Sequence, residues 1–280
     1  MTMTTTPAQP AAAPGGVEPM GPSHLTVVSL LRHGFLLTWR SLLKIKRNPE
    51  EILGLTFMPI MFVGLFVFVF GQAMMGDWQV YRDFLMPGII AQSVIFTTIG
   101  TGITLNTDIQ KGIFDRFRSL PITRSSPLVG AVLGDLIRYF LTVVVIMAVG
   151  MAIGFRPENG MAGVLASTAV IMLFAFALCW ISAWLGLVMR TQMAVQNFGM
   201  IWMFPLSFGS SAFVDPADMP GWMATFAEVN PVTHVVDTMR GLLGGGDAAV
   251  LQPLAWTLGW TVVITAVFFP LAARAYRNRS

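Results

Sequence analysis

The sequence predicts an all-α polytopic membrane protein with six transmembrane helices. Of its 280 residues, 55% are hydrophobic and only 11% are charged, whereas soluble domains carry roughly 25% charged residues. Six mainly apolar segments reach the roughly 20 residues that a helix needs to cross the hydrocarbon of a bilayer. Basic residues gather in alternate connecting segments, which is typical of a multi-pass protein.

The N-terminal region is expected to lie outside the membrane. Residues 1–23 are rich in Thr, Pro, Ala and Gly and contain no Lys or Arg, so we expect a disordered cytoplasmic tail without a secretory signal. Residues 24–47 show helical periodicity, with apolar residues on one face and cations on another. We predict an interfacial amphipathic helix here, although a soluble helix packed on a partner subunit has the same pattern.

The six predicted spans follow this helix. They are residues 52–72, 84–105, 128–155, 161–189, 193–213 and 251–271.

The basic residues predict the orientation of these spans, because cytoplasmic loops retain Lys and Arg during insertion. With both termini cytoplasmic, three bases fall outside, namely Arg82, Arg156 and Arg240, and Arg138 lies within a span. The cytoplasmic segments then hold Arg32, Arg40, Lys44, Lys46, Arg47, Lys111, Arg116, Arg118, Arg124, Arg190, Arg274, Arg277 and Arg279. We therefore predict a multi-pass protein of a bacterial inner membrane, and we attribute the net charge of +3 to orientation rather than to nucleic-acid binding.

The cytoplasmic loop at residues 106–127 has a pattern of its own. Ile109, Ile113 and Phe117 follow one another at intervals of four, which predicts a short helix with a narrow apolar stripe, ended by Pro121. Charged residues flank the stripe at Asp108, Lys111, Asp115, Arg116 and Arg118. Periodicity alone leaves open whether this helix docks on a partner or lies among lipid headgroups.

The third span carries two charges, Asp135 and Arg138. A spacing of three residues places them on one side of a helix and predicts an intramembrane ion pair. Charges in a span normally face protein or water. The pair could serve as a gate or could simply stabilise the cytoplasmic part of the helix, and its sequence does not decide between these roles.

The outer segment at residues 214–250 is the longest predicted connection. Pro220 precedes an apolar stretch containing Trp222, and Asn230–Pro231 interrupts it, so we expect two short helices separated by a turn. These helices could dip into the outer leaflet or form a soluble cap.

Several kinds of site are not expected. The sequence lacks the G-x-x-x-x-G-K-[ST] motif that holds nucleotide phosphates. Its three histidines, His24, His33 and His234, fall on different sides of the predicted membrane, and Cys179 is the single cysteine. We therefore predict no catalytic, cofactor or metal site in this chain.

Two stretches resemble a known family. GIFDRFRSLPI (112–122), followed by GDLIRY (134–139), is similar to the membrane subunit of daunorubicin/doxorubicin-resistance ABC exporters. FPLSFGSSAFVDPADMPGW (204–222) with NPVTH (230–234) resembles the ABC-2 permease family.

The resemblance implies an ABC-2 (type V exporter-like) transmembrane domain, working as a half-transporter. Its partners would be a second copy of itself, membrane lipid, a hydrophobic small-molecule substrate and a cytoplasmic ATPase that binds ATP and Mg²⁺. The resemblance also makes the helix in the 106–127 loop the element that couples to the ATPase. Its residues would be Asp108, Ile109, Lys111, Ile113, Asp115, Arg116, Phe117 and Arg118.

The function implied is export of amphipathic drugs or antibiotics, driven by a separate ATPase. One alternative keeps the fold and changes the cargo to a lipid, a glycolipid or a polyketide-derived product. A more remote alternative is a membrane-embedded enzyme, which would need clustered acid–base residues at one membrane face.

Overall fold

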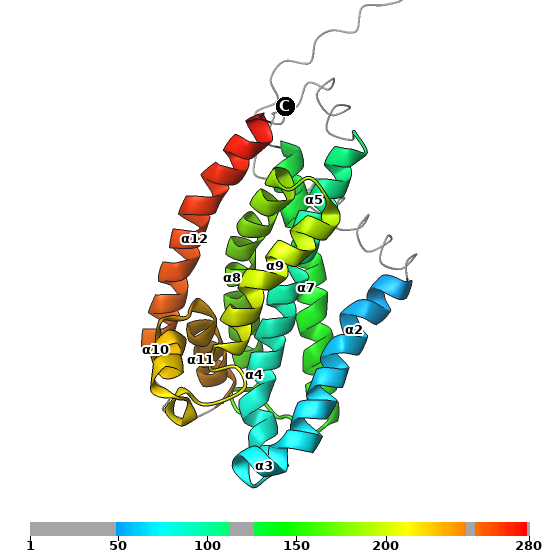
Figure 1. Ribbon diagram of the computed structural model, residues 1–280. Coiled ribbons are helices and arrows are strands. Elements are labelled where there is room, and N and C mark those ends of the chain that lie inside the picture. The colour runs from blue at the N-terminus through cyan, green and yellow to red at the C-terminus, as the bar shows by residue number, and fades with distance from the viewer. Residues whose placement is uncertain (1–48, 113–125, 245–249, 279–280) are drawn as a thin grey trace, which may run out of the picture.

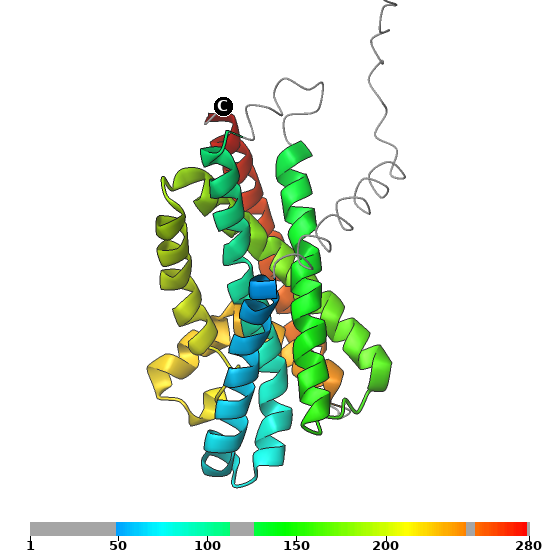
Figure 2. The ribbon, with the colours of Figure 1, turned by 90° about the vertical axis from the view of Figure 1, so that its right-hand side faces the viewer.

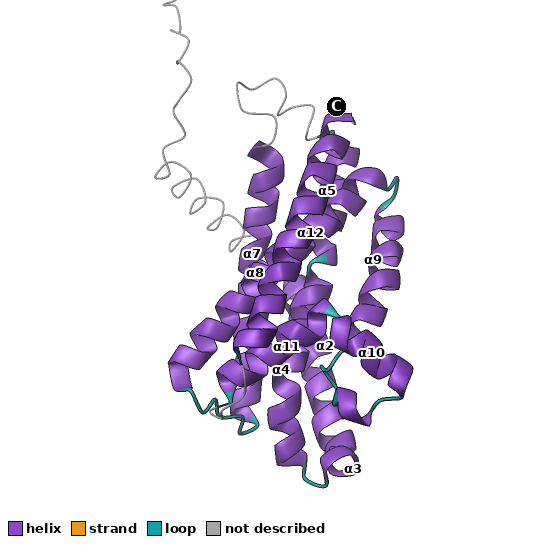
Figure 3. Cartoon of the chain, turned by 90° about the vertical axis from the view of Figure 1, so that its left-hand side faces the viewer, coloured by secondary structure: helices purple, strands orange, loops and turns teal. Residues whose placement is uncertain are grey.

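The computed structural model describes residues 49–112, 126–244 and 250–278. Every regular element within these ranges is a helix (Figure 3). The α-helices are α2 (Pro49–Gly64), α3 (Gly71–Met75), α4 (Trp78–Thr97), α5 (Ile99–Gln110), α7 (Ser126–Ala152), α8 (Gly160–Val188), α9 (Gln192–Phe208), α10 (Gly221–Val229), α11 (Pro231–Leu243) and α12 (Leu251–Asn278). A π-helix η1 (Leu65–Phe70) joins α2 to α3, and a 3₁₀ turn η2 (Pro216–Asp218) precedes α10.

The long helices run up and down in one elongated bundle (Figures 1 and 2). The turn between α3 and α4 and the turn between α7 and α8 lie at one end, which we call the α3 end. The C-terminal end of α12 and the end of α5 lie at the opposite end, which we call the C-terminal end. The chain therefore alternates direction from one long helix to the next, as a multi-pass membrane protein does.

Five helical segments of the described chain are long and apolar enough to cross a membrane. They are Phe57–Met75, Trp78–Gln110, Gly134–Ala152, Gly160–Val188 and Leu251–Arg277. The remaining candidate for a span, α9, has 17 residues. Six spans thus remain the prediction, and five satisfy the criteria of length and composition.

The second span is longer than its apolar run suggests. Asp77 caps α4 by accepting a hydrogen bond from the Gln79 amide at 2.8 Å, so the helix begins at Trp78 rather than at residue 84. The helix is interrupted only at Thr98, and α5 continues to Gln110.

The structure corrects the predicted continuous helix from Asp108 to Arg118. The helix α5 ends at Gln110, and a turn follows in which Gly112 has φ +64°. A left-handed glycine is a common helix stop, because it has no Cβ to clash with the following carbonyl group. Ile109 therefore belongs to the last turn of α5. Residues 113–125 lie outside the described residues, as does the predicted interfacial helix at 24–47.

Two other predicted ends also move. The helix α9 stops at Phe208, five residues before the predicted end at 213, and the next residues form a compact turn. The helix α12 continues beyond residue 271 to Asn278, so its last two turns carry Arg274 and Arg277.

The helix α11 does not belong to a separate cap. It follows α10 after Asn230 and packs against α8, α12 and α4 inside the half of the bundle nearest the α3 end (Figures 1 and 3). Val235, Val236 and Met239 of α11 are almost completely buried there. This segment is therefore a short helix inserted among the long ones.

Close contact between α5 and α8 depends on glycine. A Cβ added to Gly186 would collide with the carbonyl oxygen of Gly102, and a Cβ added to Gly102 would collide with the carbonyl oxygen of Ser182. Small residues of this kind let two membrane helices approach at backbone distance. This contact holds α5 against α8 in the half of the bundle that contains the C-terminal end of α5.

Candidate functional site

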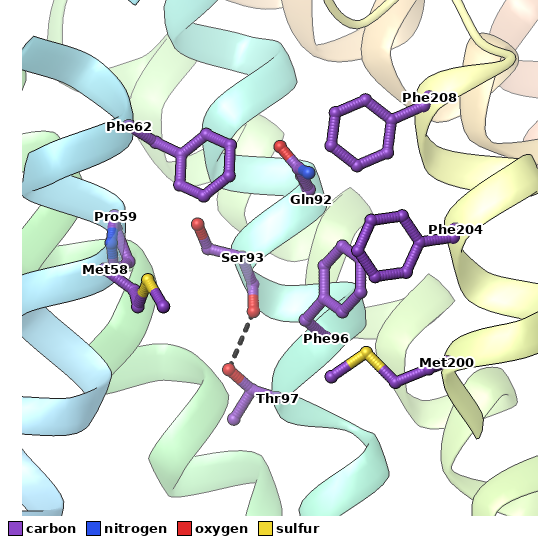
Figure 4. Close-up of a pocket in the computed structure, with 10 residues that line it drawn as sticks. All are labelled: Met58, Pro59, Phe62, Gln92, Ser93, Phe96, Thr97, Met200, Phe204 and Phe208. Atoms are coloured by element: carbon purple, nitrogen blue, oxygen red, sulfur yellow. Dashed lines mark hydrogen bonds between the residues drawn. The ribbon is translucent and has the colours of Figure 1, made fainter. Parts of the chain in front are cut away.

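A pocket of about 370 Å³ opens between α2, α4 and α9 (Figure 4). The middle helix α4 forms its floor, and the other two helices form its walls. Its volume lies within the ~300–1,000 Å³ range of small-molecule sites. The lining residues are Met58, Pro59 and Phe62 from α2, Gln92, Ser93, Phe96 and Thr97 from α4, and Met200, Phe204 and Phe208 from α9.

The lining is mainly aromatic and thioether. Phe204 and Phe208 are stacked with centroids 5.3 Å apart, and Phe96 meets Phe204 edge to face at 5.4 Å. Aromatic faces and edges of this kind attract further rings, and methionine side chains adapt to ligands of different outline. The pocket therefore suits a flat apolar molecule of variable shape.

The aromatic residues continue from the pocket toward the α3 end. Phe208 stacks on Phe213 at 5.2 Å, and Phe213 lies 4.9 Å from Phe66 of the π-helix. Phe66 in turn contacts Phe62 at 5.7 Å and Phe70 at 5.5 Å. A continuous series of rings thus joins α4, α9 and the first span on one side of the bundle.

The polar groups of the pocket all lie on α4. Thr97 donates a hydrogen bond from its hydroxyl to the carbonyl oxygen of Ser93 at 2.7 Å, so its polar group is satisfied within its own helix. Gln92 is 6% exposed, and its amide points into the space between the rings of Phe62 and Phe208 (Figure 4). No residue that lines the pocket carries a charge.

Asn230 shapes the end of α9 that borders this site. Its amide nitrogen donates to the carbonyl oxygens of Leu206 at 2.7 Å and Gly209 at 2.9 Å, and its Oδ1 accepts from the Val232 amide at 2.9 Å. The side chain therefore ends one helix and caps the next, with Pro231 in the first position of α11.

A second polar cluster holds α11 to the rest of the bundle. Arg240 pairs with Asp237 at 2.8 Å and donates to the carbonyl oxygen of Phe84 at 3.2 Å and to that of Ser211 at 2.9 Å. The Ser211 hydroxyl donates to Asp237 at 2.7 Å. Burial lowers the pKa of Arg240, and the nearby carboxylate of Asp237 opposes that shift. The cluster joins α11, α4 and the turn after α9.

Two other predicted residues of the outer segment, Pro220 and Trp222, lie on or next to α10. Pro220 precedes the first turn of α10, and the Trp222 side chain on that helix is exposed. Neither contributes to the polar clusters or to the pocket.

The Asp135–Arg138 pair lies in α7, away from the pocket lining. Arg138 Nη1 and Asp135 Oδ1 are 3.5 Å apart. Next to them, the Tyr139 hydroxyl shares hydrogen bonds with the Thr101 hydroxyl and with the Cys179 thiol, whose sulfur is 2.9 Å away. These contacts join α7 to α5 and α8 through buried polar side chains. The predicted pair thus lies on α7 beside Tyr139, which makes the link between the three helices.

The predicted coupling residues fall at the C-terminal end of the bundle where they are described. Asp108, Ile109 and Lys111 form the end of α5 and its cap. Next to them, Gln110 donates to the carbonyl oxygen of Arg190 at 3.1 Å, and Asn106 donates to that of Met189 at 2.8 Å. These bonds tie the end of α5 to the α8–α9 turn. Ile113, Asp115, Arg116, Phe117 and Arg118 lie outside the described residues.

The described residues hold no group of three or more His, Cys, Asp or Glu side chains that could bind a metal ion. The candidate site is the pocket between α2, α4 and α9, whose lining residues are uncharged. Sequence reasoning did not find its lining, because Gln92 and Ser93 stand inside an apolar run and the phenylalanines look like ordinary lipid-facing residues. The one available signal was Gln92 itself, an amide in the middle of a predicted span.

One family model and several known proteins match this chain, and all of them are transport proteins. Residues 33–243 match the family model described as ABC-2 type transporter. The chain is 36% identical over 260 residues to the daunorubicin resistance ABC transporter permease protein DrrB1 of Streptomyces coeruleorubidus, covering 92% of this chain and 90% of that one. It is 27% identical to the probable doxorubicin resistance ABC transporter permease protein DrrC of Mycobacterium tuberculosis, covering 88% of each chain. A putative transport permease, ycf38 of Cyanophora paradoxa, is 23% identical over 88% of each chain.

Proposed function

Because the chain belongs to the ABC-2 type transporter family, we propose that it is the membrane subunit of an ATP-driven exporter of amphipathic drugs or antibiotics. A separate cytoplasmic subunit binds ATP with Mg²⁺ and hydrolyses the ATP. The observation that carries the proposal is the uncharged, aromatic pocket between α2, α4 and α9. Relatives named as permeases for daunorubicin and doxorubicin resistance support the same class of cargo.

The pocket favours small amphipathic molecules as cargo. Its volume of about 370 Å³ is large enough for a few fused rings, and its phenylalanine rings and thioethers match the hydrophobic face of such a molecule. It borders the space outside the bundle, since Met58 and Phe204 are about half exposed. A molecule dissolved in the membrane can therefore reach it without first crossing a polar surface. Two copies of the chain, facing each other across this side, would enclose it.

Energy enters the proposed exporter at the C-terminal end of the bundle. We assign this end to the cytoplasm, since it holds both the segment after Gln110 and the basic tail of α12. The loop with residues 113–118 contacts the ATPase, and movement of this loop is passed to α5 and α7, which flank it in sequence. The buried contacts of Tyr139 with Thr101 connect these two helices. The α3 end then lies on the side of the bacterial inner membrane that is opposite the cytoplasm.

The proposal is tested by transport in inverted membrane vesicles. The chain is co-expressed with its cognate ATP-binding subunit, and uptake of daunorubicin is followed after MgATP is added. We expect accumulation that requires both subunits and that stops when the ATPase carries a substitution in its nucleotide-binding lysine. Uptake that is equal with and without this chain would contradict the proposal.

A further inference from the structure

The residue Gln92 is largely buried, but its side-chain amide is open to the pocket and makes no hydrogen bond to any described residue. Its side chain belongs to the floor of the pocket, and only 6% of the residue is exposed. It stands between a wall from α2 and a wall from α9, among the rings of Phe62 and Phe208 (Figure 4). Its position near the middle of the apolar segment Trp78–Gln110 keeps it far from the polar ends of the bundle.

An amide in this position is unusual for a membrane helix. Buried polar side chains in proteins are nearly always hydrogen-bonded, because an unpaired one keeps the full cost of losing its water. Neighbouring Thr97 follows that rule, since its hydroxyl donates to the Ser93 carbonyl oxygen. The Gln92 amide therefore offers both a donor and an acceptor to whatever occupies the pocket.

The other properties of the pocket restrict what that occupant can be. The lining carries no charge, so an ionised group placed there would lose its hydration without gaining a partner. The Phe204 and Phe208 rings are close to parallel, at 13°, and present a face on which a flat ring can stack. A ligand that uses every feature is flat and aromatic and has a neutral polar group on its edge.

We propose that Gln92 is the hydrogen-bonding residue of the cargo site, and that it selects polycyclic aromatic molecules carrying a ring carbonyl or a similar uncharged group. The inference rests on the proposed function, since it names the cargo class of the same pocket. The aromatic walls bind the ring system of any such molecule. The amide then distinguishes a molecule with a polar edge from a pure hydrocarbon of the same shape.

Two probes of equal shape test this assignment. Anthracene and 9,10-anthraquinone share one three-ring frame, and only the second has carbonyl groups. Binding of each radiolabelled probe to the purified full-length chain in lipid nanodiscs is measured by equilibrium dialysis, with empty nanodiscs subtracted. The wild-type chain should prefer anthraquinone. Gln92→Leu, which keeps the size of the side chain, should weaken anthraquinone binding about tenfold and leave anthracene binding unchanged.

Thr98→Val is the matched control. It removes a buried polar group beside the pocket, but Thr98 does not line the pocket and its hydroxyl is already bonded to the Ile95 carbonyl oxygen. It should change the preference between the two probes less than twofold. A structural role for Gln92 is tested separately by melting without ligand, where Gln92→Leu should leave the melting temperature unchanged or raise it, because no internal hydrogen bond is lost.

Three results would overturn the inference: equal binding of both probes by the wild-type chain, equal losses of both in Gln92→Leu, or a clear fall in its melting temperature without ligand. None of these depends on ATP or on the partner subunit. ATP-driven daunorubicin uptake could therefore still be present when the role of Gln92 is rejected, and the role of Gln92 could stand when uptake fails.

Discussion

The guanidinium of Arg240 lies over the ring of Phe84, with its Cζ atom 3.8 Å from the ring centroid. The same guanidinium donates to the Phe84 carbonyl oxygen, so one side chain of α11 holds both the ring and the backbone of α4. A stacked, forked contact of this kind requires arginine, because a lysine has a single ammonium group and no planar face. The contact fixes how deeply α11 inserts into the bundle.

Removing this arginine should destabilise the protein. Arg240→Leu leaves Asp237 without its cation and leaves two carbonyl oxygens without their donor, so we expect a loss of about 3 kcal/mol in the free energy of unfolding. Arg240→Lys should recover only part of this loss. Arg156→Leu is the control, because the hydrogen bonds of Arg156 within the described residues go to the carbonyl oxygens of Met151 and Phe155, which are close to it in sequence. Thermal melting in detergent compares the three, and equal melting temperatures for Arg240→Leu and Arg156→Leu would contradict the prediction.

The glycine contact between α5 and α8 should not tolerate a methyl group. Gly102→Ala places a Cβ against the Ser182 carbonyl oxygen, which forces two helices apart. We expect a loss of roughly 1–3 kcal/mol in the free energy of unfolding. Gly259→Ala in α12 is the matched control, since a Cβ there meets no atom within 4 Å and alanine favours the helix. Melting curves in which both variants behave alike would refute the packing argument.

The aromatic wall of the pocket should matter for transport, whereas a similarly exposed ring elsewhere on α9 should not. Phe204 and Phe198 are 49% and 51% exposed, but only Phe204 lines the pocket. Phe204→Ala should lower ATP-driven daunorubicin uptake about tenfold through the lost ring contacts. Phe198→Ala should retain at least half of the wild-type rate. If both variants transport like the wild type, the cargo does not use this wall.

Acidification should weaken the contact between α11 and α12. His234 stacks on Trp256 with centroids 5.4 Å apart, and burial lowers the pKa of His234, partly opposed by Asp237. The unfolded chain therefore binds a proton more readily than the folded one. The stability contributed by neutral His234 is present above the ordinary histidine pKa of about 6.5 and is lost as the pH falls through the lower folded value. Melting temperature measured from pH 7.5 to pH 5 should fall less in His234→Phe than in the wild type. An identical pH profile for the two proteins would show that His234 has no part in it.

The coupling loop is tested by separating ATP hydrolysis from transport. Phe117→Ala combined with Arg118→Ala should abolish stimulation of the ATPase by daunorubicin while leaving the chain inserted in the membrane. Arg190→Ala, in the turn between α8 and α9 at the same end of the bundle, should retain stimulation. Normal stimulation and uptake in the double variant would place the coupling surface elsewhere.

The apolar runs were sufficient to predict the helical membrane fold, because length and charge alone decide whether a segment can cross a bilayer. They were less informative about helix ends. The Asp77 cap and the left-handed Gly112 set the ends of the second span, and both lie beyond its apolar run. The early end of α9 follows from the hydrogen bonds that Asn230 makes from 21 and 24 residues away.

The pocket could not be predicted, because it depends on three helices that are distant in sequence. A phenylalanine such as Phe204 satisfies the lipid criterion whether or not it lines a cavity. Arg240 and Asp237 both fall in the predicted outer segment at 214–250, yet the structure holds them among helices. Their spacing of three residues would have suggested a pair, but only the insertion of α11 explains their other partners.

The single cysteine, Cys179, is completely buried beside Tyr139 and Thr101. A thiol enclosed in this way does not meet water-borne reagents. The natural chain is therefore already suited to site-directed labelling, without prior removal of native thiols. A cysteine introduced at Trp222, near the α3 end, or at Met193, near the α8–α9 turn, would be the accessible one, since these side chains are 76% and 72% exposed. A membrane-impermeant maleimide applied to intact spheroplasts should then modify the first and spare the second, which reads the orientation of the chain directly.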